Sequence, residues 1–239
     1  MKKAKKENTL FNIIFNIAIP SVLLIWGGKF LKNKGIESIL GLDASVLIFV
    51  LALAFPIIYG IYDLVSRKKW NVISIIGVIS VFLTGGIGLM QLSREWIIAK
   101  EGLVPLVLGV IVLISSFTKK PLIKALVYND AVLNIEKLEA KLIENNNMDA
   151  FNSEFKKINY IFAFSFLLSA ILNFALASYI FTANSSQEEF NEQVGKMTAL
   201  SYPVIVLPTT IIMLFATFKI FKAIKKYSNL GFEELLNTD

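Results

Sequence analysis

Six mainly apolar stretches are the feature that most constrains how this chain folds. Each is about 20 residues long, the length at which a helix rising about 1.5 Å per residue crosses a hydrocarbon layer of about 30 Å. Lipid offers no partner to an exposed backbone N–H or C=O, and the stretches are too continuous for the alternating strands of an outer-membrane barrel. We therefore expect six transmembrane helices, over residues 9–28, 44–62, 72–92, 97–118, 160–183 and 198–218.

The composition is typical of a membrane protein and removes most catalytic chemistry. Hydrophobic residues make up 55% of the chain and charged residues 18%, and the mean hydropathy is +0.64. Cysteine and histidine are absent, which excludes disulfides, Cys/His zinc sites and catalytic pairs that use either residue. No paired carboxylates lie at the middle of a span to share acid and base work. We therefore expect no enzyme, no cofactor and no metal site.

The positions of the cations predict the orientation of the chain. The net charge is +6, but the cations occur in short clusters between apolar stretches, so they do not indicate nucleic acid. Most of the 24 Lys and Arg residues fall in the N-terminal segment, residues 67–69, residues 119–159 and the C-terminal tail. Loops rich in Lys and Arg stay in the cytoplasm, so both termini are expected there. The start MKKAKKE also suits a secretory signal, but no Ala-x-Ala-like site follows, so we expect a retained helix.

Residues 119–159 form the longest segment between spans, and we expect a cytoplasmic insert there. Apolar residues at helical spacing predict a short amphipathic helix, which Asn145 to Asn147 end. Asp149 is a plausible cap for a further turn or two leading to the fifth span. The insert is either a docking surface for a partner or anionic lipid, or a linker that covers the inner helix ends. The apolar residues of the expected helix are Ala131, Ile135, Leu138 and Leu142.

Small residues on one face of the third span predict close packing of helices. Such a face lets a neighbouring helix approach closely, which is how helices associate in lipid. A phosphate-binding loop is the alternative, but no Gly-Lys-Ser/Thr follows the glycines, no strand precedes them, and the G-x-G-x-x-G spacing is absent. The residues that share this face are Gly77, Thr84, Gly85 and Gly88.

Four charged residues, Arg94, Glu95, Lys100 and Glu101, are expected at the outer membrane surface. Glu95 and Lys100 are most simply solvated groups. Glu101 lies about a turn inside the fourth span, where a carboxylate needs a cation, so we expect it to pair with Arg94 or Lys100. A solute or proton site at Glu101 is the alternative interpretation.

Amide and hydroxyl side chains recur every four residues along two spans. Asn12 and Asn16 do so in the first span, and Ser165, Ser169 and Asn173 in the fifth. Such groups either form hydrogen bonds between helices, worth under about 2 kcal/mol each, or line a polar cavity.

Residues 85–127, GGIGLMQLSREWIIAKEGLVPLVLGVIVLISSFTKKPLIKALV, resemble the central part of the intracellular septation protein A family. Those bacterial inner-membrane proteins have Gly-Gly near a helix end, an acidic and aromatic outer turn, and a Lys-Lys-Pro-Leu-Ile-Lys cytoplasmic start, here Lys119 to Lys124. Residues 170–181, AILNFALASYIF, are similar to that family's fifth helix. The whole chain more closely resembles a related, uncharacterised group of six-span bacterial membrane proteins. It departs from the septation pattern in a longer insert and in Lys100-Glu101-Gly102, where the family has Lys-Pro.

The resemblance implies a role in cell envelope synthesis or division through contacts with other membrane proteins, without catalytic residues. We expect a single all-α membrane domain over residues 1–239, in the bacterial inner membrane, which contacts lipid and possible envelope partners but not nucleic acid. The alternative is a small-solute or proton-coupled transporter. Its polar or ion site would comprise Glu101, Arg94, Lys100, Asn12, Asn16 and Asn173.

Overall fold

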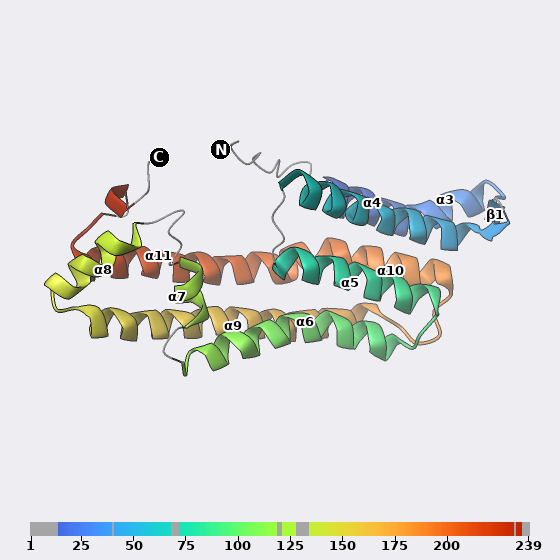
Figure 1. The fold of residues 1–239 in the computed structure, drawn as a ribbon. Helices are drawn as coiled ribbons and strands as arrows, with labels where there is room; N and C mark the ends of the chain where they lie inside the picture. The colour runs from blue at the N-terminus through green and yellow to red at the C-terminus, as the bar shows by residue number, and fades with distance from the viewer. Residues whose placement is uncertain are drawn as a thin grey trace. The chain divides into compact units, whose positions relative to one another are not determined.

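The structure, a computed structural model, describes residues 14–39, 41–67, 72–118, 121–127, 134–231 and 233–235. Most of these residues are helical, which confirms the all-α fold class (Figure 1). Two short strands, β1 (Ser38–Ile39) and β2 (Leu42–Asp43), pair antiparallel in the connection between the first two long helical segments. The sequence analysis did not predict this hairpin, because two-residue strands carry no alternating pattern of their own.

Among the described residues, five helical segments are long and apolar enough to cross a membrane, and each overlaps one of the expected spans. The expected third span coincides with α5 (Val72–Leu89), of 18 residues. The apolar part of α5 that the structure describes is shorter, Ile79–Leu89, so a sixth crossing stays a prediction. The five long segments are Ile14–Asn33, Ala44–Ile61, Arg94–Ser115, Met148–Ile180 and Gln187–Ser228.

Helices extend beyond the predicted spans at both ends of the chain. The first segment is built from η1 (Ile14–Ala18), α2 (Ile19–Val22), η2 (Leu23–Gly27) and α3 (Gly28–Asn33). The helical structure therefore continues to Asn33, beyond the expected membrane span. Lys29 and Lys32 in this extension lie near Glu192 and Glu188, a contact that hydropathy does not report.

The last segment is one helix of 42 residues, although only residues 198–218 were expected. It comprises α10 (Gln187–Ser201), the π-helical η3 (Tyr202–Val206) and α11 (Leu207–Ser228). Pro203 lies in η3 and Pro208 directly after it, where widened turns accommodate backbone positions that lack an N–H donor. At about 1.5 Å per residue, 42 residues of helix measure about 60 Å, about twice the thickness of the hydrocarbon layer.

The chain divides into two compact units. The first comprises Met1–Gly102 and Leu172–Ile205, and the second comprises Leu103–Ile171 and Val206–Asp239. The division falls inside α6 (Arg94–Ser115) and α9 (Met148–Ile180) and at the end of η3. Each unit has its own buried apolar cluster.

The core of the first unit lies where α4 (Ala44–Arg67) meets η2, α5 and α10. The ring of Phe49 is fully buried, and its centroid lies 5.7 Å from that of Phe190 in an edge-on contact. Phe181 extends the aromatic group, 5.9 Å from Phe190. Three elements distant in sequence are thereby joined around one aromatic cluster.

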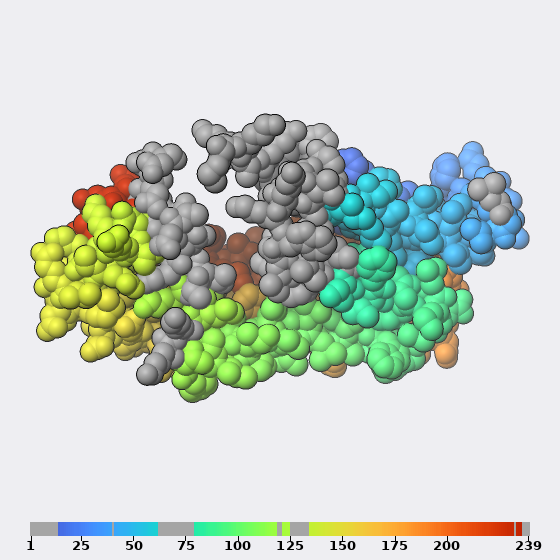
Figure 2. All heavy atoms as spheres, viewed as in Figure 1, coloured from blue at the N-terminus to red at the C-terminus, as the bar shows by residue number. Residues whose placement is uncertain are grey.

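The second unit contains the expected amphipathic helix, α8 (Ile135–Glu144). Leu138 and Leu142 are fully buried, as their spacing predicts, whereas Ala131 lies outside the described residues. Asn134 caps the helix by accepting a hydrogen bond from the Lys137 N–H at 2.8 Å. Figure 2 shows α8 and the C-terminal turn η4 (Glu233–Leu235) packed against each other on this face.

The break at Asn145 to Asn147 is confirmed, and Asn146 has a positive φ of 53°. The helix that follows is not a separate turn or two, because α9 continues without interruption for 33 residues. Phe151 and Phe155 are fully buried in its first turns, with ring centroids 4.8 Å apart.

A buried amide, Asn159, connects three helices of the second unit. Its Nδ2 donates to the carbonyl of Val112 in α6 at 2.7 Å and to the hydroxyl of Ser116 at 2.6 Å. Its Oδ1 accepts from the N–H of Ile123 in α7 (Leu122–Val127) at 3.1 Å. The amide thereby satisfies backbone groups that the end of α6 and the start of α7 leave without a helical partner.

Candidate functional site

A buried ion pair lies about two turns into α6. The Nζ of Lys100 is 2.7 Å from Oε1 of Glu101 and donates to the Oγ1 of Thr84 in α5 at 2.8 Å. The Thr84 hydroxyl in turn donates to the carbonyl of Ser80 at 3.0 Å, which leaves its lone pairs free to accept from Lys100. Only 9% of the Lys100 side chain and 21% of the Glu101 side chain are exposed. We call Thr84, Lys100 and Glu101 the ion-pair site.

This geometry corrects the expectation that Lys100 is solvated, and it shows which cation pairs with Glu101. Lys100 is not a solvated group, because its long side chain turns inward to Thr84. The cation that faces Glu101 is Lys100, while Arg94 lines a pocket nearby. A charge removed from water costs several kcal/mol unless an opposite charge and hydrogen bonds compensate for it. The neighbouring hydroxyl and carboxylate supply that compensation to the ammonium group.

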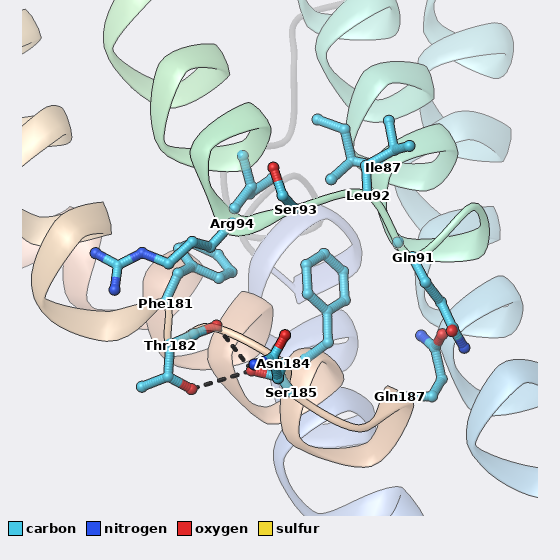
Figure 3. Close-up of a pocket in the computed structure, with 13 residues that line it drawn as sticks. Ile87, Gln91, Leu92, Ser93, Arg94, Phe181, Thr182, Asn184, Ser185 and Gln187 are labelled. Atoms are coloured by element: carbon cyan, nitrogen blue, oxygen red, sulfur yellow. Dashed lines mark hydrogen bonds between the residues drawn. The ribbon is translucent and has the colours of Figure 1, made fainter.

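The pocket lies where the α5–α6 turn meets the α9–α10 turn, and has a volume of about 110 Å³. That volume is below the range of about 300–1,000 Å³ common for small-molecule sites, so it suits a few waters or a small solute. Figure 3 shows side chains from both turns converging on it. We call it the turn pocket; its polar lining comprises Gln91, Ser93, Arg94, Thr182, Asn184, Ser185 and Gln187.

The polar groups of the turn pocket already bond to one another on the α9–α10 side. The hydroxyls of Thr182 and Ser185 are 3.0 Å apart, and Nε2 of Gln193 donates to Thr182 Oγ1 at 2.8 Å. Arg94 extends away from these hydroxyls (Figure 3). Among the lining residues named above, Arg94 is the charged one.

Ile97 lies between the turn pocket and the ion-pair site along α6. It lines the pocket, is 1% exposed, and precedes Lys100 and Glu101 in α6 by three and four residues. Residues at these spacings share a helix face, so an apolar side chain lies between the pocket and the charges along α6. The two features are neighbours on one helix but are separated by a hydrophobic group.

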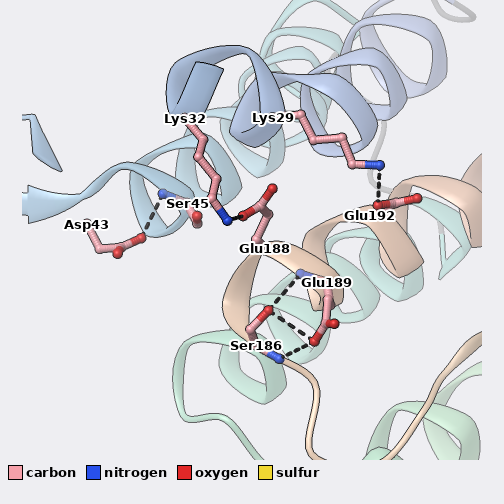
Figure 4. A network of polar contacts seen from close by, with 8 residues as sticks. All are labelled: Lys29, Lys32, Asp43, Ser45, Ser186, Glu188, Glu189 and Glu192. Carbon is pink, nitrogen blue, oxygen red and sulfur yellow. Dashed lines mark hydrogen bonds and ion pairs between the residues drawn. The ribbon is translucent and has the colours of Figure 1, made fainter. Parts of the chain in front are cut away.

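A second polar network joins α3 to α10 (Figure 4). Nζ of Lys29 is 2.7 Å from Glu192, Lys196 is 2.7 Å from the other oxygen of Glu192, and Lys32 is 3.6 Å from Glu188. Sequence spacing does not predict these ion pairs, because Glu192 and Glu188 lie more than 150 residues from Lys29 and Lys32. The network fixes the end of α3 against α10.

Two carboxylates at the start of α10 have lowered pKa values. Both precede the apolar residues from Thr198 onward. Hydrogen bonds from Lys196 and then from Lys29 lower the pKa of Glu192 below 4.5. Glu189 forms a capping box with Ser186, whose backbone N–H donates to it at 2.8 Å, and this bond lowers the pKa of Glu189. Both groups are thus charged at neutral pH and hold the helix start in place.

The small residues of α5 lie against large neighbours. A Cβ added to Gly88 would lie 2.6 Å from the rings of both Phe49 and Phe190, and one added to Gly85 would lie 3.2 Å from Leu53. The absence of a side chain at Gly88 therefore lets α5 approach α4 and α10. The surroundings of Gly77 lie outside the described side chains.

Of the three asparagines of the predicted ion site, the structure describes Asn16 and Asn173. Asn12 lies outside the described residues. Asn16 in η1 and Asn173 in α9 are half-buried, and neither lines the turn pocket. Of the charged residues of the predicted site, Lys100 and Glu101 pair with each other, whereas Arg94 lines the turn pocket together with residues of the α9–α10 turn. Hydropathy alone had marked that turn only as a loop.

Within the described part of the chain, no three acidic side chains come together in a way that could hold a metal ion. No protein-family model, curated protein or solved structure matches the chain. Function is therefore argued from the contacts themselves.

Proposed function

We propose that this chain is a non-enzymatic, six-span protein of the bacterial inner membrane, with both termini cytoplasmic, that acts through contacts with other membrane proteins in cell envelope maintenance or septation. The observation that carries the proposal is that buried polar groups of the helices bond to neighbouring helices. The ion-pair site joins α5 and α6, and Ser165 of α9 donates to the Thr209 carbonyl at 3.1 Å. Among the described buried side chains, only the Ser21 hydroxyl is without a partner. Such a bundle supports a contact role better than a water-filled passage.

The α5–α6 turn is the surface that we propose for the partner. Met90 is 71% exposed and Trp96 is 62% exposed, and Leu89 and Leu92 are exposed beside them. Leu89 ends α5, Met90 and Leu92 follow it, and Trp96 lies in the first turn of α6. In the proposed six-span topology the chain leaves the membrane at this turn. A cluster of large apolar side chains at such a place suits burial against another protein or the membrane boundary. The resemblance to the septation family also covers this turn.

Site-specific photo-crosslinking in intact cells tests the partner proposal. A photoreactive residue at position 90 is expected to attach to proteins of envelope synthesis or division, identified by mass spectrometry. The matched control is position 136, an exposed residue of α8 in the expected cytoplasmic insert. Identical adducts at both positions, or only lipid adducts at position 90, would argue against the proposal.

The topology has a direct test because the chain has no cysteine. Single cysteines at positions 90 and 184 are expected to react with a membrane-impermeant reagent added outside intact cells. A cysteine at position 137 is expected to react only after the cells are opened. Labelling of positions 137 and 184 from the same side would contradict the six-span topology.

Proton-coupled or small-solute transport is the second candidate, and the ion-pair site one turn from the turn pocket favours it. A buried carboxylate beside a lysine is a common part of proton pathways in membrane proteins. In proteoliposomes with an internal pH dye, this candidate predicts proton flux that Glu101→Gln abolishes and Glu95→Gln leaves unchanged. Equal proton flux in liposomes with and without the protein would contradict a transport function.

A further inference from the structure

A second cavity, of about 380 Å³, lies along α11 in the second unit. Its walls combine exposed aromatic side chains with three lysines, and a carboxylate of α9 borders it. We call it the basic groove; it is lined chiefly by Phe215, Phe218, Lys219, Lys222, Lys226 and Glu154.

The lysines of the basic groove follow one face of α11. Lys219, Lys222 and Lys226 are spaced by three and four residues, so their side chains project from the same side of the helix. Among the described residues none of them forms an ion pair, although Nζ of Lys226 donates to the hydroxyl of Tyr227 at 3.3 Å. Glu154, the carboxylate that borders the groove, is paired with Lys157 at 3.3 Å. Three lysines and one carboxylate line the groove, so its lining carries a net positive charge.

The other end of the basic groove is apolar. Phe215 is 55% exposed and Phe218 is 68% exposed, and Nζ of Lys219 lies over the Phe215 ring at 5.3 Å from its centroid. The change from aromatic to cationic side chains occurs within one turn, at the end of the apolar residues of the last span. This order along the helix is that of a membrane boundary, with acyl chains below and phosphates above.

We infer that the basic groove binds the headgroup of an anionic phospholipid. The lysines would contact the phosphate and the two phenylalanines would contact the first part of an acyl chain, so one lipid molecule matches both ends of the groove. A soluble phosphate or a phosphorylated peptide would leave the aromatic end exposed to water. The inference rests on the membrane location given under the proposed function.

Native mass spectrometry of the full chain, released from nanodiscs that contain phosphatidylglycerol and phosphatidylcholine, tests this inference. The wild-type protein is expected to retain one phosphatidylglycerol in preference to phosphatidylcholine. The variant Lys219→Gln/Lys222→Gln/Lys226→Gln is expected to bind it about a hundredfold more weakly, because each lysine near an anionic surface contributes about a fivefold factor. Circular dichroism verifies that the variant is folded.

A matched control removes the same number of charges elsewhere in the second unit. Lys137→Gln/Lys141→Gln/Lys156→Gln is expected to change retention less than about twofold. Wild-type retention in the groove variant, an equal loss in the control, or displacement of the lipid by millimolar inorganic phosphate would each overturn the inference. The position-90 crosslink, measured in the groove variant, reports on the proposed function separately, because it does not depend on the groove.

Discussion

Each unit contains a polar contact that joins its helices, and these two contacts differ in charge. In the first unit the central contact is a charge pair, Lys100 with Glu101, supported by the Thr84 hydroxyl. In the second unit the central contact is the neutral amide of Asn159, which bonds to two backbone groups and to the hydroxyls of Ser115 and Ser116. A charge must be balanced by an opposite charge, whereas an amide can satisfy a donor and an acceptor of the backbone itself. Loss of one charged residue in the first unit therefore leaves the opposite charge without its partner. Loss of Asn159 in the second unit instead leaves the groups that it bonds without a hydrogen-bond partner.

The units also differ in a second set of contacts between helices, which are charged in the first unit and apolar in the second. The first unit joins α3 to α10 through Lys29, Glu192 and Lys196. The second unit joins α8 to α9 through fully buried leucines and phenylalanines. Ionic strength and pH should act mainly on the first unit, because apolar contacts carry no charge to screen or titrate.

Loss of one ion-pair partner is the largest expected effect. Lys100→Met leaves the Glu101 carboxylate without its cation and is expected to lower the free energy of unfolding by about 3 kcal/mol. The double variant Lys100→Met/Glu101→Leu is expected to recover most of that loss, since no buried charge remains. Unfolding in a denaturing detergent titration measures both. A double variant no more stable than Lys100→Met would show that the charges are not coupled.

Removal of the buried amide of Asn159 is expected to have the next largest effect on stability. Asn159→Leu keeps a similar volume but leaves the Ile123 N–H without its acceptor, with an expected cost of about 2 kcal/mol. The same titration measures it, with Asn152→Leu as a control on the same helix, where the amide is only partly buried. Equal stability of the two variants would mean that the amide does not organise the second unit.

Substitution of two glycines in α5 separates the effect of close helix packing from the effect of helix propensity. Gly88→Ala is expected to destabilise the protein by about 1–3 kcal/mol, because the new methyl group would overlap two aromatic rings. Gly86→Ala, two residues away, meets no atom within 4 Å and is expected to stabilise the helix by up to about 1 kcal/mol. Thermal unfolding in detergent compares the pair. A loss of stability in both variants would instead indicate a general need for glycine in α5.

The smallest effect concerns pH. The pKa of Glu192 lies below its ordinary value of 4.5, so its ion pairs stabilise the fold above that pH and are lost as the pH falls through the lowered pKa. Glu192→Gln is expected to cost under about 1 kcal/mol at pH 7 and to reduce the change in stability between pH 6 and pH 3. Glu139→Gln, in α8, serves as the control. Unchanged acid sensitivity in Glu192→Gln would place the titrating groups elsewhere.

Particular elements show what could be predicted from the residues. The helical spacing of Leu138 and Leu142 correctly indicated α8, because periodicity is a local property of the chain. The first and last helical segments extend beyond the expected membrane spans. Hydropathy does not indicate these extensions, because polar residues such as Lys29 and Gln187 resemble loops until their partners are known. The burial of Lys100 was missed for the same reason, since Thr84 lies sixteen residues earlier, on another helix.

The sequence by itself determined that the chain is helical, that at least five segments suit a membrane, and that Cys and His chemistry is excluded, because these follow from apolar length and composition. Only the tertiary structure decided which charges are paired, which glycines are in close contact and where the turn pocket and the basic groove lie. Those features depend on side chains that meet across tens or hundreds of residues. Their partners are selected by the packing of the helices and not by spacing along any one of them.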